Sequence, residues 1–265
     1  MKILNRILEN KVPNHGFVNG LAWLAQQEVQ PLSLRDYARE IHEAGNLKPP
    51  FEVYLPSGFV KEGVIYVPGE RTLLVRESPL INLAKARELG DKLKQLDNIL
   101  NTDYMGELTE DKYKECKRLE NQLRCAVLEI NPDSYLEMAK EDRKKAPEER
   151  RVFEVDYKKL VFTTQKASPW RGYLLNNENL EQEDIFRWAF QDYTKEQAEA
   201  HRKWDGGMVG KTFFMFGGPE IKNFFGDKPF VQQMIYTPNE RGFLEPGDNE
   251  RYLRGTILGI KRKNR

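Results

Sequence analysis

The stretch from about Leu83 to Lys145 most constrains the fold, because it predicts helices between two regions that are mainly strand-like. Apolar residues recur there at helical spacing in two successive runs, so each run predicts a helix with one apolar stripe. The first run is Leu89, Leu93, Leu96 and Leu100, and the second is Tyr113, Cys116, Leu119, Leu123, Val127 and Ile130. A short turn at 101–106 joins them, so burying the two stripes against each other gives an antiparallel helical hairpin.

The charges of this stretch nearly cancel, which argues against a hairpin that clamps nucleic acid. Two arrangements are open. The hairpin packs back on its own domain, or it projects as an arm that docks on a partner.

Strand-like segments flank the hairpin on both sides, separated by glycine- and proline-rich turns. Before it they are 51–55, 63–67 and 71–76, preceded by helices at 18–29 and 33–45. After it they are 151–156, 159–164, 172–175, 212–216, 230–236 and 252–260, with one long helix at 180–204. We predict an α+β fold of mainly antiparallel strands with an inserted antiparallel helical hairpin. The expected divisions are 1–80, 81–150 and 151–265, the first and last forming one body.

Composition narrows the class of protein. Of the 265 residues, 39% are hydrophobic and 31% are charged, which is typical of a soluble globular chain. No apolar run reaches about eighteen residues, so we expect no membrane contact. Residues 1–9 predict a small amphipathic helix and not a signal peptide, which favours the cytoplasm or a virion component made there.

Metal or cofactor chemistry built on cysteine or histidine is not expected. The two cysteines, Cys116 and Cys125, lie nine residues apart on one predicted helix and therefore on opposite faces. The three histidines, His15, His42 and His201, are dispersed and lack the spacing of a zinc or iron site. We predict no metal and no cofactor, and surface or structural roles for the histidines.

Two stretches resemble motifs of nucleotide chemistry, but the residues around them do not fit those motifs. Residues 206–212 end like a phosphate-binding loop, but Asp205 stands where the first glycine is needed. The loop also follows a predicted helix and precedes a strand, the reverse of the order that points a helix N-terminus at phosphate. Residues 203–206 have the letters of the adenylation motif of ligases, without enough chain after them for the further motifs.

One enzymatic hypothesis remains. Asp133, Asp156 and Lys158 are the residue types of a magnesium-dependent nuclease of the restriction-endonuclease kind. In such a site two carboxylates hold the ion and a lysine orients the attacking water. Asp156 and Lys158 would share one face of a strand with Glu154. Asp133 fits less well, because it lies between two predicted helices.

The region from Trp170 to Tyr252 combines aromatic residues with cations. Rings on strands and cations on adjoining loops are what single-stranded nucleic acid needs, because bases stack on rings while phosphates are neutralised. The candidate nucleic-acid-binding residues are Lys203, Lys211, Arg241, Arg251, Arg254, Lys261, Arg262 and Lys263. Strands also need rings to fill a core, which is the role we expect for most of them. With a net charge of +1, any contact with nucleic acid must be local.

The sequence therefore favours a non-enzymatic binding or structural subunit of a larger assembly, such as a viral or mobile-element ribonucleoprotein or particle. The hairpin and the aromatic-basic C-terminal surface would be its contact elements. Its expected partners are protein and, in second place, nucleic acid, with RNA or single strands preferred to duplex. The nuclease is the alternative.

Overall fold

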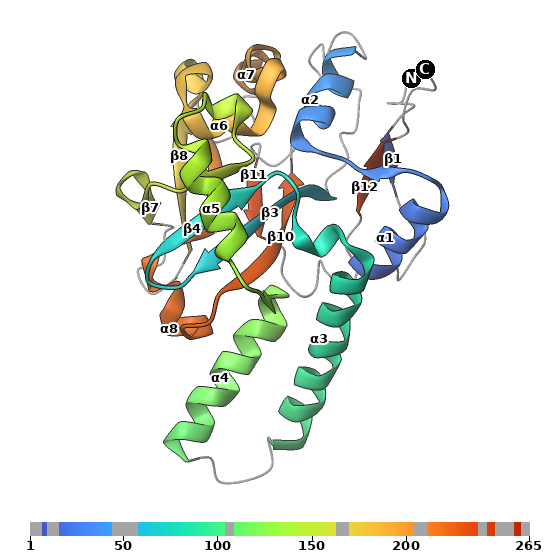
Figure 1. Cartoon of the computed structure of the whole chain (residues 1–265), viewed down its shortest axis with the longest axis vertical. Helices are drawn as coiled ribbons and strands as arrows, with labels where there is room; N and C mark the ends of the chain where they lie inside the picture. Colours follow the sequence, from blue (N-terminus) through green and yellow to red (C-terminus); the bar gives the residue numbers. More distant parts are fainter. Residues whose placement is uncertain are drawn as a thin grey trace.

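The computed structural model describes residues 7–9, 16–43, 58–103, 109–162, 170–203, 211–237, 243–246 and 257–260. Most of its strands form one nine-stranded sheet, ordered β6-β4-β3-β10-β11-β9-β8-β7, with β5 paired to β10 off this path (Figure 1). These strands are β3 (Gly58–Val67), β4 (Arg71–Val75), β5 (Leu128–Glu129), β6 (Val152–Glu154), β7 (Val161–Phe162), β8 (Trp170–Asn176), β9 (Lys211–Gly217), β10 (Phe230–Thr237) and β11 (Phe243–Pro246).

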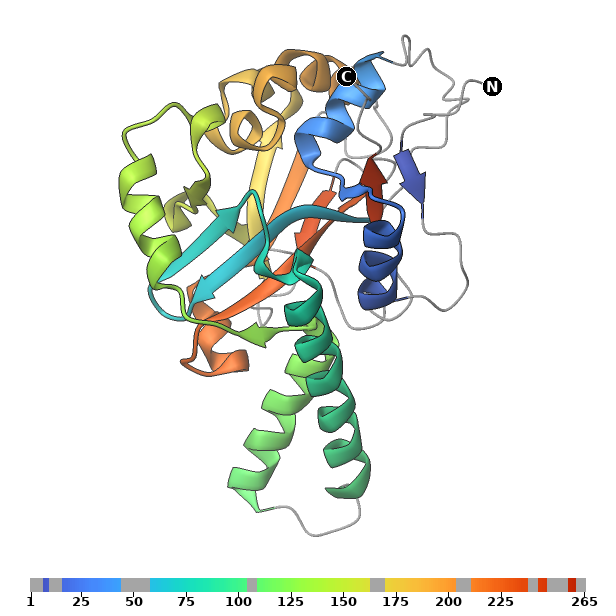
Figure 2. The same cartoon turned by 45° about the vertical axis from the view of Figure 1, so that its right-hand side comes forward.

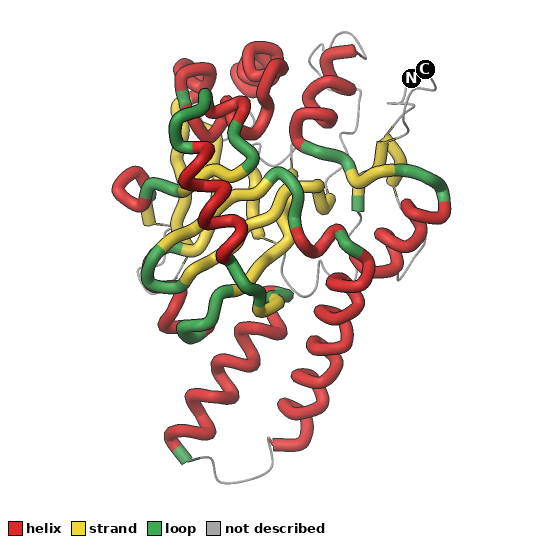
Figure 3. Tube along the Cα trace, viewed as in Figure 1, coloured by secondary structure: helices red, strands yellow, loops and turns green. Residues whose placement is uncertain are grey.

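The pairs within the large sheet are antiparallel, except that β11 runs parallel to β9. A second sheet joins the two ends of the chain in the order β1 (Ile7–Glu9), β12 (Leu258–Ile260) and β2 (Gln30–Pro31). Figure 3 shows the strands gathered in the middle of the body with helices around them. The predicted α+β class is confirmed. The strand expected at 51–55 lies outside the described residues.

The large sheet curls on itself. Three strands separate β4 from β9 along the sheet, yet Thr72 of β4 donates a hydrogen bond to the Gly217 carbonyl of β9 at 3.2 Å. The Gly217 N–H in turn donates to the Tyr66 hydroxyl of β3 at 3.0 Å. Such contacts need a strongly twisted sheet whose far strands fold back over the near ones. The aromatic core lies inside this curl.

Helices cover both faces of the central strands. Along β3, Val64 and Tyr66 face the interior of the curl, while Ile65 faces the other side, as the two-residue period of a strand requires. The interior is closed by α2 (Leu34–Glu43), α6 (Asp184–Phe190) and α7 (Thr194–Lys203). The other face is closed by α1 (Phe17–Gln26), the first turns of α3 (Leu83–Asp103) and α5 (Asp133–Asp142).

The predicted hairpin is present as α3 and α4 (Glu110–Cys125), and Figures 1 and 2 show the pair projecting from the body. We call these two helices the arm. The side chain of Asn82 caps α3, because its Oδ1 accepts a hydrogen bond from Ala84 N at 2.9 Å. At the base of α4, Asn121 donates to the Phe224 carbonyl of α8 (Lys222–Phe225) at 3.4 Å. The arm is therefore tied to the body at α4 by this hydrogen bond and at α3 by Leu89 and Leu93, which pack in the core.

Three predicted elements differ in the structure. The second helix of the hairpin, whose apolar run was expected to continue to Ile130, ends at Cys125, and Leu128–Glu129 form strand β5. Residues 7–9 of the expected N-terminal helix form strand β1, which pairs with β12 near the other end of the chain. The single helix expected at 180–204 is divided into a 3₁₀ segment (Asn177–Gln182), α6 and α7. The division falls at Gln191, whose φ of 54° is incompatible with a continuous helix.

Candidate functional site

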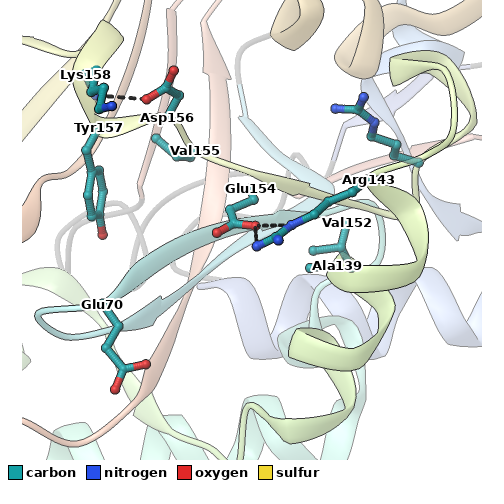
Figure 4. Close-up of a pocket in the computed structure, with 10 residues that line it drawn as sticks. Glu70, Ala139, Arg143, Val152, Glu154, Val155, Asp156, Tyr157 and Lys158 are labelled. Carbon is teal, nitrogen blue, oxygen red and sulfur yellow. Dashed lines mark hydrogen bonds and ion pairs between the residues drawn. The ribbon is translucent and has the colours of Figure 1, made fainter.

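A pocket of about 460 Å³ opens beside β6. Its residues come from α5, from β6 and its flanks, from the short 3₁₀ helix η3 (Tyr157–Lys159), and from the turn between β3 and β4 (Figure 4). Three small apolar side chains and one ring line it, namely Ala139, Val152, Val155 and Tyr157. The charged lining residues are Glu70, Arg143, Arg150, Glu154, Asp156 and Lys158.

Asp142 holds β6 in place beside α5. Its side chain is fully buried, and its Oδ2 accepts hydrogen bonds from Arg151 N at 2.6 Å and Val152 N at 3.0 Å. Its Oδ1 lies 2.7 Å from Lys145 Nζ. Burial raises the pKa of Asp142, but the hydrogen bonds from Lys145, Val152 and Arg151 outweigh it, so the pKa lies below its ordinary value. The carboxylate therefore stays charged at neutral pH.

Replacing Asp142 by alanine is expected to lower the free energy of unfolding by about 3 kcal/mol, because it leaves two backbone N–H groups and a lysine without their acceptor. Denaturant unfolding at pH 7 measures the loss. The neighbouring Glu141, 66% exposed, is the control, and its replacement by alanine is expected to cost less than about 0.5 kcal/mol. Equal effects at the two positions would contradict this role of Asp142.

Part of the charge in the pocket is neutralised within the protein. Arg143 Nη2 lies 2.8 Å from Glu154 Oε2, and Arg71 Nε lies 3.6 Å from the other oxygen of the same carboxylate. Lys158 and Glu70 form no ion pair with any described residue. Arg150 and Asp156 of the lining likewise form no ion pair with a described residue, so the pocket presents two cations and two anions that are open to a ligand.

Tyr157 lines the pocket, and its hydroxyl group keeps its proton. Thr72 donates its hydroxyl proton to Gly217, so the 2.9 Å contact between Thr72 and Tyr157 has the tyrosine as donor. Burial raises the pKa of Tyr157. The ten lining residues include no serine, threonine, cysteine or histidine. The arrangement is therefore suited to binding and offers no activated nucleophile of the Ser-His or Cys-His kind.

The structure brings together two of the three residues of the nuclease hypothesis. Asp156 and Lys158 line the pocket, whereas Asp133 is the first residue of α5 and is not part of the lining. Asp156 and Lys158 also do not share a strand, because the chain leaves β6 at Glu154 and Asp156 caps η3 by accepting from Lys158 N at 3.0 Å. Within the described part of the chain, no three His, Cys, Asp or Glu side chains gather as a metal site needs.

The eight basic candidates for nucleic-acid binding lie at or beyond the limits of what the structure describes. The backbone of Lys203 ends α7 and that of Lys211 begins β9. The side chains of both, and the whole of the other six, are outside the described residues. The structure therefore leaves this surface as a prediction.

The aromatic residues of the same region mostly fill the core, as expected. Trp188, Phe214, Phe216, Phe230 and Tyr236 are each at most 2% exposed. Each of them packs against another ring of the core, for example Phe214 against Phe186 with ring centroids 6.3 Å apart. These rings cannot stack on bases.

A buried polar network was not foreseen from the sequence. His201 of α7 lies between Thr212 of β9 and Tyr236 of β10, with ring nitrogens 2.8 Å and 3.3 Å from their hydroxyls. Thr212 donates to Asn177 at 2.8 Å, and Gln197 donates to Tyr236 at 3.0 Å. The network ties α7 to the sheet, and His201 at its centre is 3% exposed.

Comparisons with known proteins leave the family open. No family model and no curated protein matches the chain. A solved chain, reported in work on the accommodation of massive sequence variation in Nanoarchaeota by the C-type lectin fold, is similar over 97% of each chain with a TM-score of 0.48 and 11% identity. A similarity of this extent carries no argument about function. In the described residues, no helix has the length and apolar character needed to cross a membrane.

Proposed function

We propose that this chain is a non-enzymatic protein-binding subunit that holds a helical segment of a partner protein at the distal end of the arm. The observation that carries the proposal is the change in burial along the arm. Leu89, Leu93 and Leu96 are at most 5% exposed, whereas Ile99, about one helical turn nearer the tip than Leu96, is 41% exposed. On α4, Leu119 is 9% exposed and Tyr113, nearer the tip, is 52% exposed.

In the part of the arm that the structure describes, Ile99 and Tyr113 are thus large apolar side chains exposed toward the tip. A helical hairpin is stable in water when its two stripes cover each other, and exposed large apolar residues at its end are suited to a third helix. Tyrosine is well adapted to such a contact, because it buries a large ring at little entropic cost. The outer faces of the arm carry charges paired within each helix, such as Arg118 with Glu115 at 2.7 Å, and these pairs favour solvent.

The base of the arm supports this role. Leu89 and Leu93 pack into the core beneath the sheet, and α4 is anchored on α8 through Asn121. Helices on a fixed base lose little conformational entropy when they bind. The proposal therefore needs no rearrangement of the body.

Site-specific photocrosslinking in the native cells tests the proposal. A photoreactive residue at Tyr113 is expected to give one adduct of discrete mass, and the same residue at the adjacent Lys114, whose side chain is 68% exposed, is the control. Because Ile99 would be buried by the partner, Ile99→Glu is expected to weaken binding by about 2 kcal/mol, or ~30-fold, and to remove the adduct. Equal adducts at both positions, or adducts that survive Ile99→Glu, would refute the proposal.

A further inference from the structure

The backbone of β6 has one open side. β6 stands at the end of the strand order and pairs with β4. Arg76 N donates to the Arg151 carbonyl, and Val155 N donates to the Thr72 carbonyl. Because backbone groups alternate in direction along an antiparallel strand, the carbonyl of Arg151 and the backbone groups of residues 153 and 155 point to β4, and those of Val152 and Glu154 point outward.

Along the open side of β6, two backbone N–H groups have acceptors within the protein, and the N–H between them has none among the described residues. The outward N–H of Val152 donates to the Asp142 carboxylate at 3.0 Å. The N–H of Asp156 donates to the Tyr173 hydroxyl at 2.8 Å. Between them, the Glu154 N–H has no acceptor among the described residues. An exposed strand edge can pair with another strand. On β6 such pairing is restricted to the backbone at Glu154.

The pocket lies along this edge. Val152, Glu154 and Asp156 all line it. Ala139 of α5 and Arg143, the residue after α5, form the opposite wall, and Arg143 reaches across to Glu154 in Figure 4. A volume of about 460 Å³ is within the range of ligand sites. A groove between an edge strand and a helix is suited to an extended peptide, which binds through its main chain.

The charges of the lining narrow the kind of peptide. Arg143 and Glu154 pair with each other, and the lining residues left without an ion pair among the described residues are two cations, Arg150 and Lys158, and two anions, Glu70 and Asp156. A segment with side chains of one sign would meet like charges in every register, whereas a segment with both signs can match them. We propose that this pocket binds an extended peptide segment that carries both acidic and basic side chains and exchanges main-chain hydrogen bonds with Glu154.

This site is separate from the arm, so either proposal stands without the other. The test is selection from a library of short blocked peptides, about six residues long and randomised at the central positions, on the wild-type protein. The enriched peptides are expected to contain both an acidic and a basic residue. They are also expected to slow hydrogen exchange of the Glu154 amide by about tenfold.

Two variants of Glu154 separate its main chain from its side chain. Glu154→Pro removes the outward N–H, and since that group points away from β4 no ladder bond is lost. Glu154→Ala keeps the N–H and removes the ion pair with Arg143, a loss that the proline variant shares. The enriched peptides are expected to bind Glu154→Ala about tenfold more tightly than Glu154→Pro.

Three results would overturn the proposal. They are the absence of any enriched peptide, equal binding to the two variants, and an unchanged exchange rate at Glu154. Should the proline variant not fold, the exchange measurement on the wild type decides alone. Lys144→Ala is the control for non-specific charge effects, because Lys144 is exposed and does not line the pocket.

Discussion

Acidification from pH 6.5 to pH 3 is expected to lower the free energy of unfolding through His201 by on the order of 4 kcal/mol. Burial lowers the pKa of His201 from 6.5 to about 3. Between these two pH values the imidazole of His201 is protonated in the unfolded chain and neutral in the folded protein. The contribution is therefore fully present above pH 6.5 and is lost as the pH falls.

The buried network explains why the ring must stay neutral. Thr212 gives its proton to Asn177, so it can only accept from His201 Nδ1, which therefore carries the ring proton. The Tyr236 hydroxyl accepts from Gln197 and directs its own proton at Nε2. A second proton on the ring would face the proton of Tyr236 in a site that is 3% exposed. Protonation thus breaks a bond and buries a charge.

The measurement compares denaturant unfolding of the wild type and His201→Gln at several pH values from 3 to 7. The variant is expected to be less stable at pH 7, because it loses the ring contacts with Phe186 at 5.4 Å, but to depend less on pH. His42→Gln, at an exposed position, is the control and should follow the wild type. Parallel curves for the wild type and His201→Gln would contradict the prediction.

Replacing Glu62 by glutamine is expected to stabilise the protein at high pH by on the order of 4 kcal/mol. Glu62 is 2% exposed, and both of its carboxylate oxygens lie near Leu34 N, the first residue of α2, at 3.0 and 3.2 Å. Burial raises the pKa of Glu62 to about 8, although the Leu34 N–H and the charge of Arg76 act against it.

The change of stability with pH that Glu62 causes is opposite in sign to the change that His201 causes. Between its unfolded pKa of 4.5 and about 8, the folded protein holds a proton that the unfolded chain has released. Its contribution to stability is therefore present below pH 4.5 and is lost as the pH rises through 8. Glutamine has no charge to bury and keeps an oxygen that can accept from Leu34 N.

Denaturant unfolding at pH 5, 7 and 9 tests this second prediction. The gain in stability of Glu62→Gln over the wild type is expected to grow with pH. The control is Glu77→Gln, whose carboxylate is 70% exposed, and its difference from the wild type should stay constant. A constant difference for Glu62→Gln as well would show that the buried carboxyl titrates normally.

Part of the site could be found from the sequence because alternation along a strand is a local pattern. Glu154 and Asp156 were placed near one another on that basis, and both line the pocket. The same pattern wrongly placed Lys158 on the strand. The Asp156 side chain accepts a hydrogen bond from Lys158 N at the start of η3, and the strand therefore ends early. Glu70 and Arg143 join the pocket only through packing, and no spacing in the sequence connects them to β6.

Helix boundaries show the same division. The arm was predicted because its leucines repeat at helical spacing, a property of neighbouring residues. The helix expected at 180–204 also has suitable local composition, yet it is broken at Gln191 so that Phe190 and His201 can pack on Tyr236. Burial of these large groups offsets the strained residue, and that gain exists only in the folded core.

The sequence by itself determined the helices of the arm, most of the described strands around it and the α+β class, because the periods of apolar residues report which face of each element is buried. Only the tertiary structure decided that the sheet curls, that the arm projects, and that Glu62 and His201 are sealed in the interior. Those features depend on contacts between residues far apart in the chain, such as Thr72 with Gly217. Their free energy arises from desolvation and packing across elements, to which no local pattern of residues corresponds.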